Sequence, residues 1–169
     1  LIGRENRLGP RALSAGQPLP PLTPPAIRAV QFNGGDGAMH VGPVFRGVTN
    51  NFTIEFWVKP AAGREATDER IAGGSGLSGQ SYAVFPTQGG QAYGGGHAGV
   101  GVSVGTNGVS VFAHGDYLIE SSLVYSTNWT GWHHVAVVYQ ERQPHLYLDG
   151  ALVRVGLVGP HAFHPSADL

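Results

Sequence analysis

The segment between Gly131 and Val155 constrains the fold more strongly than any other part of this sequence. Three runs within it are rich in β-branched and aromatic residues, which fit the pleated surface of a strand. Asp149-Gly150 separates the last two runs, and this pair favours a type I′ turn, in which both central residues need φ > 0. The segment therefore predicts three successive antiparallel strands at residues 132–139, 145–148 and 151–155.

The composition of the 169-residue chain favours an all-β domain and excludes several classes of function. Charged residues make up only 12% of the chain, whereas 27 glycines and 12 prolines supply many turn positions. The net charge of −1 gives no basic footprint for nucleic acid. No apolar run reaches the ~20 residues of a membrane helix, so membrane insertion is not expected. The absence of cysteine excludes disulfides, thiolate metal sites and a cysteine nucleophile.

Alternating patterns elsewhere predict further strands and almost no helix. The clearest run is residues 52–58, where Phe52, Ile54, Phe56 and Val58 share one face. Hairpins are expected at residues 27–32 with 38–41 and at 100–104 with 109–113, and shorter strands at 70–72, 81–85, 117–119 and 123–125. No window shows the apolar spacing of an amphipathic helix. Short strands at this density predict a two-sheet antiparallel β-sandwich.

Residues 1–25 differ in composition from the rest of the chain. Five prolines fall within residues 17–25, and proline favours extended chain that cannot donate to a sheet. We expect a proline-rich arm or linker at residues 1–25, followed by the folded domain at residues 26–169. A disordered remnant is the alternative interpretation of the first 25 residues.

Three parts of the domain resemble the signature segments of one family. They are AVQFNG (29–34) with MHV (39–41), NFTIEFWVKP (51–60), and GWHHVAVVY (131–139) with LYLDG (146–150). In order and spacing these segments resemble the laminin-G-like, concanavalin A-like jelly-roll domains. The resemblance covers residues 26–169 and implies two antiparallel sheets, one concave and one convex. Most of the matching residues belong to the core and the turns.

The sequence departs from this family after its last apolar segment. Such domains continue with a strand that ends in Ile-Gly and with a final acidic strand, and residues 156–169 contain neither. Either those residues were not included in this sequence, or another segment fills the gap. The edge left uncovered is a pairing site for another strand. The first three residues resemble the missing Ile-Gly piece. We therefore expect neighbouring copies or segments to complete one another by strand addition, through Leu1, Ile2, Gly3, Asp168 and Leu169.

The acidic residues and histidines give no sign of catalysis or of a histidine metal site. Glycosidases on this fold carry two or three carboxylates at alternate positions of one strand. None of the 11 acidic residues has that spacing, and Asp68 and Glu69 are adjacent. His133 and His134 are also adjacent, so they point to opposite faces of a strand and cannot chelate one ion. We expect packing histidines and no enzymatic activity.

The family resemblance implies a structural calcium ion beside the opening hairpin. Asn33 and Asp36 could supply part of its shell of hard oxygen ligands. The alternative is that residues 33–37 form only a turn, for which Asn, Gly and Asp are preferred. No other cofactor is expected.

Aromatic side chains beside amides mark the candidate ligand-binding residues. Trp129 and Asn128 lie in the polar segment 126–130, directly before a strand. Further aromatic candidates are Tyr93, Tyr117 and Tyr125. The alternative for Trp129 is an indole that folds back onto the sandwich.

Together these observations predict a non-catalytic extracellular module, secreted or at the cell surface, within a larger protein. Its expected role is recognition of a glycan or a protein ligand, in binding or adhesion. One alternative is a structural subunit of an extracellular assembly or filament, joined as a homo-oligomer through an open sheet edge. A second alternative is a glycoside hydrolase on the same fold, which the carboxylate spacing disfavours.

Overall fold

A computed structural model describes residues 28–35, 37–40, 47–72 and 78–163 of the chain. The chain divides into two compact units, residues 1–33 and 34–169. Every strand and helix of the described chain lies in the second unit. None of its described helices is long and apolar enough to cross a membrane.

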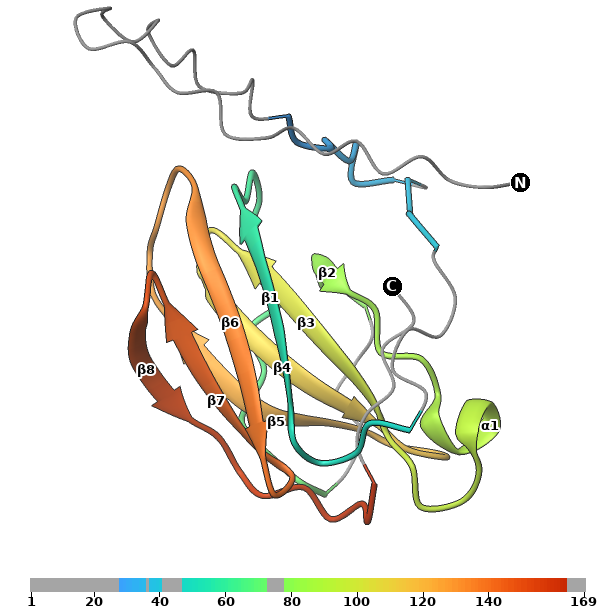
Figure 1. Ribbon diagram of the computed structural model, residues 1–169. Helices are drawn as coiled ribbons and strands as arrows, with labels where there is room; N and C mark the ends of the chain where they lie inside the picture. The colour runs from blue at the N-terminus through green and yellow to red at the C-terminus, as the bar shows by residue number, and fades with distance from the viewer. Residues whose placement is uncertain (1–27, 36, 41–46, 73–77, 164–169) are drawn as a thin grey trace, which may run out of the picture. The chain divides into compact units, whose positions relative to one another are not determined.

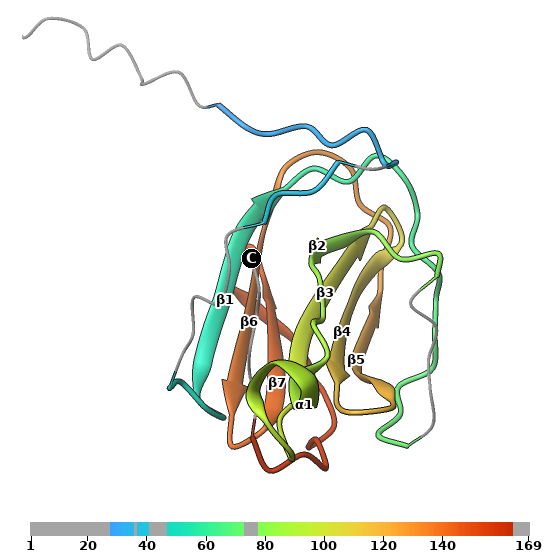
Figure 2. The same cartoon turned by 90° about the vertical axis from the view of Figure 1, so that its right-hand side faces the viewer.

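In the described residues, eight strands form two four-stranded antiparallel sheets, which face each other as two layers (Figures 1 and 2). Sheet 1 has the order β1-β6-β7-β8, with bounds Phe52–Val58, His133–Gln140, Gln143–Leu148 and Ala151–Val155. Sheet 2 has the order β2-β3-β4-β5, with bounds Tyr82–Val84, Gly99–Gly105, Gly108–His114 and Ile119–Ser126. One short helix, α1, spans Gly89–Tyr93. The predicted two-sheet antiparallel β-sandwich with almost no helix is confirmed.

Tight turns set the register of sheet 1. Asp149 and Gly150 both have positive φ, at 50° and 84°, as the predicted type I′ turn between β7 and β8 requires. The β6–β7 turn has the same signs, although its central residues Glu141 and Arg142 are not glycine. The three strands predicted between residues 132 and 155 are therefore present.

The hydrophobic core fills the space between the two layers. On β1, Phe52, Ile54, Phe56 and Val58 alternate inward as predicted, while the residues between them are exposed. The buried members of the core come from both sheets and from one loop tryptophan: Ile54, Val84, Val100, Val102, Val104, Val109, Val111, Leu123, Trp129, Val135, Val137, Tyr139, Leu146 and Leu148. Burial of this many large apolar groups is the main stabilising contribution to such a sandwich.

The outer face of sheet 2 is covered by loops that precede and follow β2. All seven residues of β3 are buried, including the glycines that point away from the core. A Cβ atom built on Gly101 would lie 2.6 Å from the ring of Pro86, so only glycine permits this approach. Arg64, which is only 3% exposed, donates to the carbonyl oxygens of Val109 and Tyr125, both at 3.1 Å.

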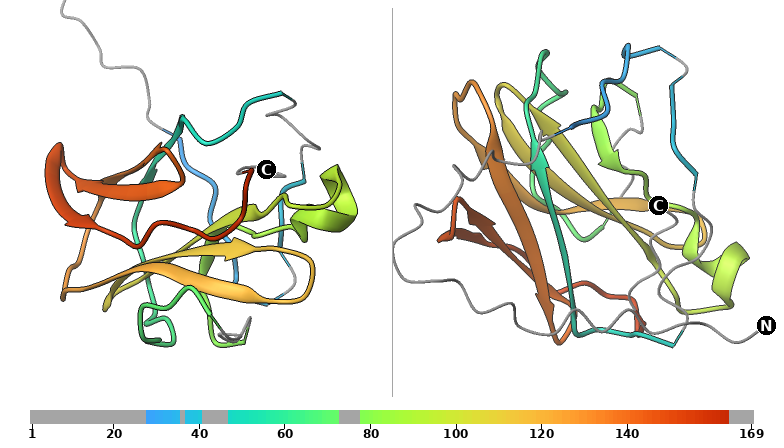
Figure 3. Two further views of the ribbon diagram at one scale, coloured as in Figure 1. Left: turned by 90° about the horizontal axis from the view of Figure 1, so that it is seen from below. Right: turned by 45° about the horizontal axis from the view of Figure 1, so that its top comes forward.

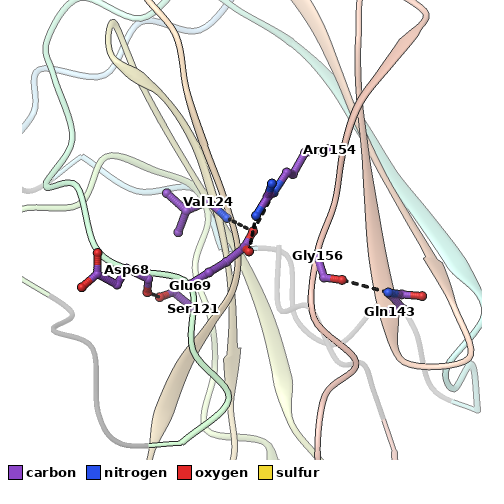
Figure 4. A network of polar contacts seen from close by, with 7 residues as sticks. All are labelled: Asp68, Glu69, Ser121, Val124, Gln143, Arg154 and Gly156. Carbon is purple, nitrogen blue, oxygen red and sulfur yellow. Dashed lines mark hydrogen bonds and ion pairs between the residues drawn. The ribbon is translucent and has the colours of Figure 1, made fainter.

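One side of the sandwich is closed by side chains that join the edge strands β5 and β8. Glu69 accepts the backbone N–H of Val124 at 2.9 Å and a bidentate pair of bonds from Arg154, as Figure 4 shows. The backbone N–H of Leu157 donates to the carbonyl of Ser122 on the same edge. These contacts give the Val124 N–H and the Ser122 carbonyl of the edge strand β5 hydrogen-bond partners that are not part of a neighbouring strand.

The opposite side is bounded by β1 and β2. In the described part of the chain β1 pairs only with β6, and β2 pairs only with β3. Figure 3 shows these two strands at one side of the layers and β8 at the other. β1 is thus an edge strand of sheet 1 as far as the structure describes it.

Three expected elements differ from the structure. Residues 28–33 and 38–40 form no strand, and Val30, Phe32 and Met39 are each at least half exposed, so the expected opening hairpin is wrong over the described residues. Residues 70–72 also form no strand, although the Arg70 N–H donates to Ser121 on the edge of β5. The two short strands expected at 117–119 and 123–125 are one strand, β5, with a register shift opposite β4.

Candidate binding site

The loop between β5 and β6 is anchored on the tight turn between β3 and β4. The backbone N–H groups of Thr127 and Trp129 donate to the carbonyl oxygens of Asn107 and Thr106, at 3.3 and 3.2 Å. The Trp129 indole N–H donates to the carbonyl of Gly105 at 2.5 Å. Three bonds therefore hold this loop to the end of the hairpin.

Trp129 belongs to the core. Its side chain is buried, with an exposed fraction of only 8%. The indole ring stacks on the imidazole ring of His133, and the two ring centroids are 4.6 Å apart. The expectation of an exposed aromatic platform at Trp129 is therefore wrong, and the folded-back alternative is the one observed. The physical reason is that the turn leaves the Gly105 carbonyl as a buried acceptor for the indole N–H.

A cavity of about 380 Å³ lies over the edge of this tryptophan. It is lined by Thr106 from the β3–β4 turn and by Asn128, Trp129 and Thr130 from the β5–β6 loop. Asn128 and Thr130 are exposed and Thr106 is partly buried, so the lining residues supply an amide and two hydroxyl groups beside the largely buried Trp129. The cavity is a shallow depression that is largely open to solvent, unlike the enclosed pockets that bury a small molecule.

His133, the first residue of β6, also holds the β5–β6 loop in place. Its Nδ1 lies 2.8 Å from Asp149 Oδ2, and its Nε2 lies 3.1 Å from the carbonyl oxygen of Thr130. Both partners are acceptors, and only a protonated imidazole can donate to both at once. The hydrogen bond to Asp149 raises the pKa of His133, and that same bond, with the His134 N–H, lowers the pKa of Asp149.

The predicted ligand-binding residues do not form a single site. Asn128 and Trp129 come together in the cavity, as their adjacency in sequence requires. Tyr125 on β5 is partly buried against the core, and Tyr117 is 95% exposed in the turn before β5. Tyr93 lies in α1 and is half-buried. None of these three tyrosines lines the cavity.

The remaining predicted residues are only partly covered by the structure. Asn33 is exposed, whereas Asp36 lies outside the described residues, so one of the two expected calcium donors can be placed. The described residues contain no cluster of three or more His, Asp or Glu side chains that could hold a metal ion. Calcium binding stays a prediction. The residues expected to take part in assembly all lie outside the described chain: Leu1, Ile2, Gly3, Asp168 and Leu169.

One buried carboxylate was not singled out from the sequence. Glu120 on β5 is 3% exposed, and its Oε1 lies 3.0 Å from Nε2 of His161. Burial raises the pKa of Glu120, although the charge and hydrogen bond of His161 oppose this effect. Glu120 does not line the cavity.

Sequence reasoning missed three contributors to the cavity and its support, namely Thr106, Thr130 and His133. Thr130 follows Trp129 in the same polar segment, so that segment was the available signal. Nothing local links Thr106 with the β5–β6 loop, because the two meet only through the folded hairpin.

Comparison with known proteins identifies the family. A family model described as the concanavalin A-like lectin/glucanases superfamily, of the laminin G type, matches residues 33–168. Searches of curated proteins and of solved structures found no match. The family match supports a carbohydrate- or protein-binding module in general terms. With most of its length matched and its two antiparallel sheets, this chain belongs to the laminin G-like branch of the concanavalin A-like superfamily.

Proposed function

We propose that the chain is a non-catalytic carbohydrate-binding module of a larger extracellular protein, secreted or attached at the cell surface. The proposal places the ligand in the cavity between the β3–β4 turn and the β5–β6 loop. The observation that carries it is the set of lining groups: one amide, two hydroxyls and an indole edge, on Asn128, Thr106, Thr130 and Trp129. Amides and hydroxyls can both donate to and accept from sugar hydroxyl groups.

The rigidity of the cavity supports this role. Backbone bonds from Thr127 and Trp129 fix the loop to the hairpin, and His133 holds the Thr130 carbonyl. A site that is already ordered loses little conformational entropy when a ligand binds, which favours affinity. The lining groups are thus presented by a supported loop.

The charge of the cavity supports binding over hydrolysis. Glycosidases use two carboxyl groups, about 5–5.5 Å apart when retaining and about 6.5–9.5 Å apart when inverting. The four lining residues include no carboxylate. Asp149, which lies behind His133, is engaged by two hydrogen bonds with that histidine and its neighbour.

A glycan array with the variants Asn128→Ala and Thr130→Ala tests the proposal. Both side chains are exposed, so we expect normal melting temperatures with at least a tenfold loss of binding to the glycans that the unmodified chain retains. Tyr117→Ala is the matched control, because it removes an exposed side chain far from the cavity in the fold. Unchanged glycan binding in both cavity variants would refute the placement of the ligand.

A structural subunit joined by strand addition is the second candidate. It is favoured by β1, which pairs on one side only among the described strands. An edge of this kind offers backbone donors and acceptors to a strand from another chain. Sedimentation velocity over a hundredfold concentration range tests this candidate, and a single monomeric species at every concentration would exclude it.

A further inference from the structure

The outer face of sheet 1 carries an exposed tryptophan, Trp57, near the end of the edge strand β1. Thr53, Glu55 and Trp57 alternate outward along β1, and Trp57 is 66% exposed. The equivalent face of sheet 2 is covered by loops, as the complete burial of β3 shows. A single exposed apolar side chain is normal on a protein surface, so a binding surface here requires further groups beside the ring.

Polar side chains lie directly beside this ring. His134 is the register partner of Trp57 across the β1–β6 pair, and their ring centroids are 5.4 Å apart at an angle of 46°. Nε2 of His134 lies 3.6 Å from Oε2 of Glu55. The Glu55 and His134 side chains are 64% and 27% exposed, so both remain open to a ligand.

The surface continues across the next two strands. Glu55 is in register with Ala136 on β6, Ala136 with Tyr147 on β7, and Tyr147 with Leu152 on β8. Ala136 is a small side chain between two larger neighbours, and Tyr147 is half-buried. Neighbouring strands lie about 4.8 Å apart, so Trp57 and Tyr147 are separated by two strand spacings across the sheet and by two residues along it.

We propose that this face, defined by Glu55, Trp57, His134 and Tyr147, is a second carbohydrate-binding surface, separate from the cavity, and that it takes a polysaccharide chain lying across the strands. The face of an aromatic ring is negative, so it attracts the positively polarised C–H groups on the apolar side of a sugar ring. The carboxylate accepts hydrogen bonds from sugar hydroxyls, and the imidazole can donate or accept.

A protein partner fits this face less well. A docked protein would desolvate the Glu55 carboxylate, which has only a histidine at 3.6 Å to compensate it. The cores of protein interfaces are accordingly depleted of Asp and Glu. The hydroxyl groups of a polysaccharide can donate hydrogen bonds to this carboxylate in place of the water that they displace.

Affinity electrophoresis of the chain in gels that contain xylan, galactomannan, laminarin or hydroxyethyl cellulose tests the proposal. We expect at least one polymer to retard the unmodified chain. Trp57→Ala should then weaken the apparent affinity at least tenfold, Glu55→Gln about threefold, and Trp57→Phe should restore part of the loss. Because the surface residues are exposed, circular dichroism and melting curves should show folded variants.

Matched variants separate this surface from the cavity and from self-association. Tyr117→Ala, which lies outside both places, should leave the retardation unchanged. In a chain that already carries Asn128→Ala, Trp57→Ala should still weaken the apparent affinity at least tenfold, because the surface on sheet 1 does not depend on the cavity. Failure of all four polymers to retard the chain would overturn the proposal, and so would retention of full affinity in Trp57→Ala. If Trp57→Ala instead dissociates a dimer in sedimentation without changing retardation, this face is a contact between copies and the carbohydrate assignment is wrong.

Discussion

Replacement of Trp129 by alanine tests whether this indole is a core residue, as the structure shows, or a ligand platform. The side chain is 8% exposed, and it belongs to the core cluster between the sheets. Truncation of a buried tryptophan costs about 3–5 kcal/mol in the free energy of unfolding. For a domain of this size that loss corresponds to a fall of about 6–20 °C in melting temperature.

Two further variants divide this effect into its causes. Trp129→Phe keeps an apolar ring but leaves the Gly105 carbonyl without its donor, so we expect a smaller loss of about 1–3 kcal/mol. Trp57→Ala removes a tryptophan that is 66% exposed, and we expect a change of about 1 kcal/mol or less. Urea denaturation followed by far-UV circular dichroism suits all three, because removal of an indole does not change this signal directly.

The refuting result is a specific combination of measurements. If Trp129→Ala unfolds within about 1 kcal/mol of the unmodified chain yet loses glycan binding, the indole contributes to a ligand surface and not to the core. If stability and binding fall together, ligand contact must be judged from Asn128→Ala, whose side chain is exposed.

The remaining predictions concern pH, the sheet edge and the covered face. His133 has a raised pKa and its aspartate partner a lowered one, so their stabilisation should be largest between the ordinary values of about 4 and 6.5 and should fall as pH rises through the His133 pKa. Melting curves from pH 4 to 8 should show this maximum, and His133→Gln should remove it. Glu69→Ala should cost about 1–3 kcal/mol in urea denaturation, because it orphans a backbone donor and Arg154, whereas Glu69→Gln should cost less. Gly101→Val should cost about 1–3 kcal/mol or more through overlap with a proline ring, whereas Gly95→Ala, with open space around it, should change the melting temperature little. A melting-temperature difference for His133→Gln that does not change with pH would contradict the first prediction. Equal losses of stability for Glu69→Ala and Glu69→Gln, or for Gly101→Val and Gly95→Ala, would contradict the second or the third.

The strands of this fold were predictable because their signals are local. Asp149-Gly150 specifies a turn within two residues, and the alternation from Phe52 to Val58 specifies a buried face within seven. The opening hairpin carried a similar pattern, yet Val30 and Phe32 are exposed and unpaired as strands. A pattern alone was insufficient there, because a strand also needs a partner to satisfy its backbone.

The candidate site was less predictable because its contacts are distant in sequence. The polar segment around Trp129 suggested an exposed loop, and only the folded β3–β4 turn provides the buried acceptor that draws the indole inward. Arg64 is a similar case, since nothing in its local sequence identifies the carbonyl groups of Val109 and Tyr125 as the partners of its guanidinium. Such partners arise from topology, which periodicity cannot specify.

The two faces of this sandwich differ in a way that limits where a ligand can bind. The outer face of sheet 2 is covered by packed loops. The glycines of β3 leave room for these loops and for the guanidinium of Arg64 to approach the sheet closely. The β5–β8 side is closed by Glu69 and Arg154. Besides the edge of β1 that faces away from β6, the described domain leaves accessible the supported cavity at the end of the β3–β4 hairpin and the outer face of sheet 1. Binding groups occur at both places, an amide with hydroxyls at one and an aromatic ring with a carboxylate at the other. Under the two proposals made above, the two sites engage two parts of one long polysaccharide, and loss of either site should weaken polymer binding more than binding of a short oligosaccharide.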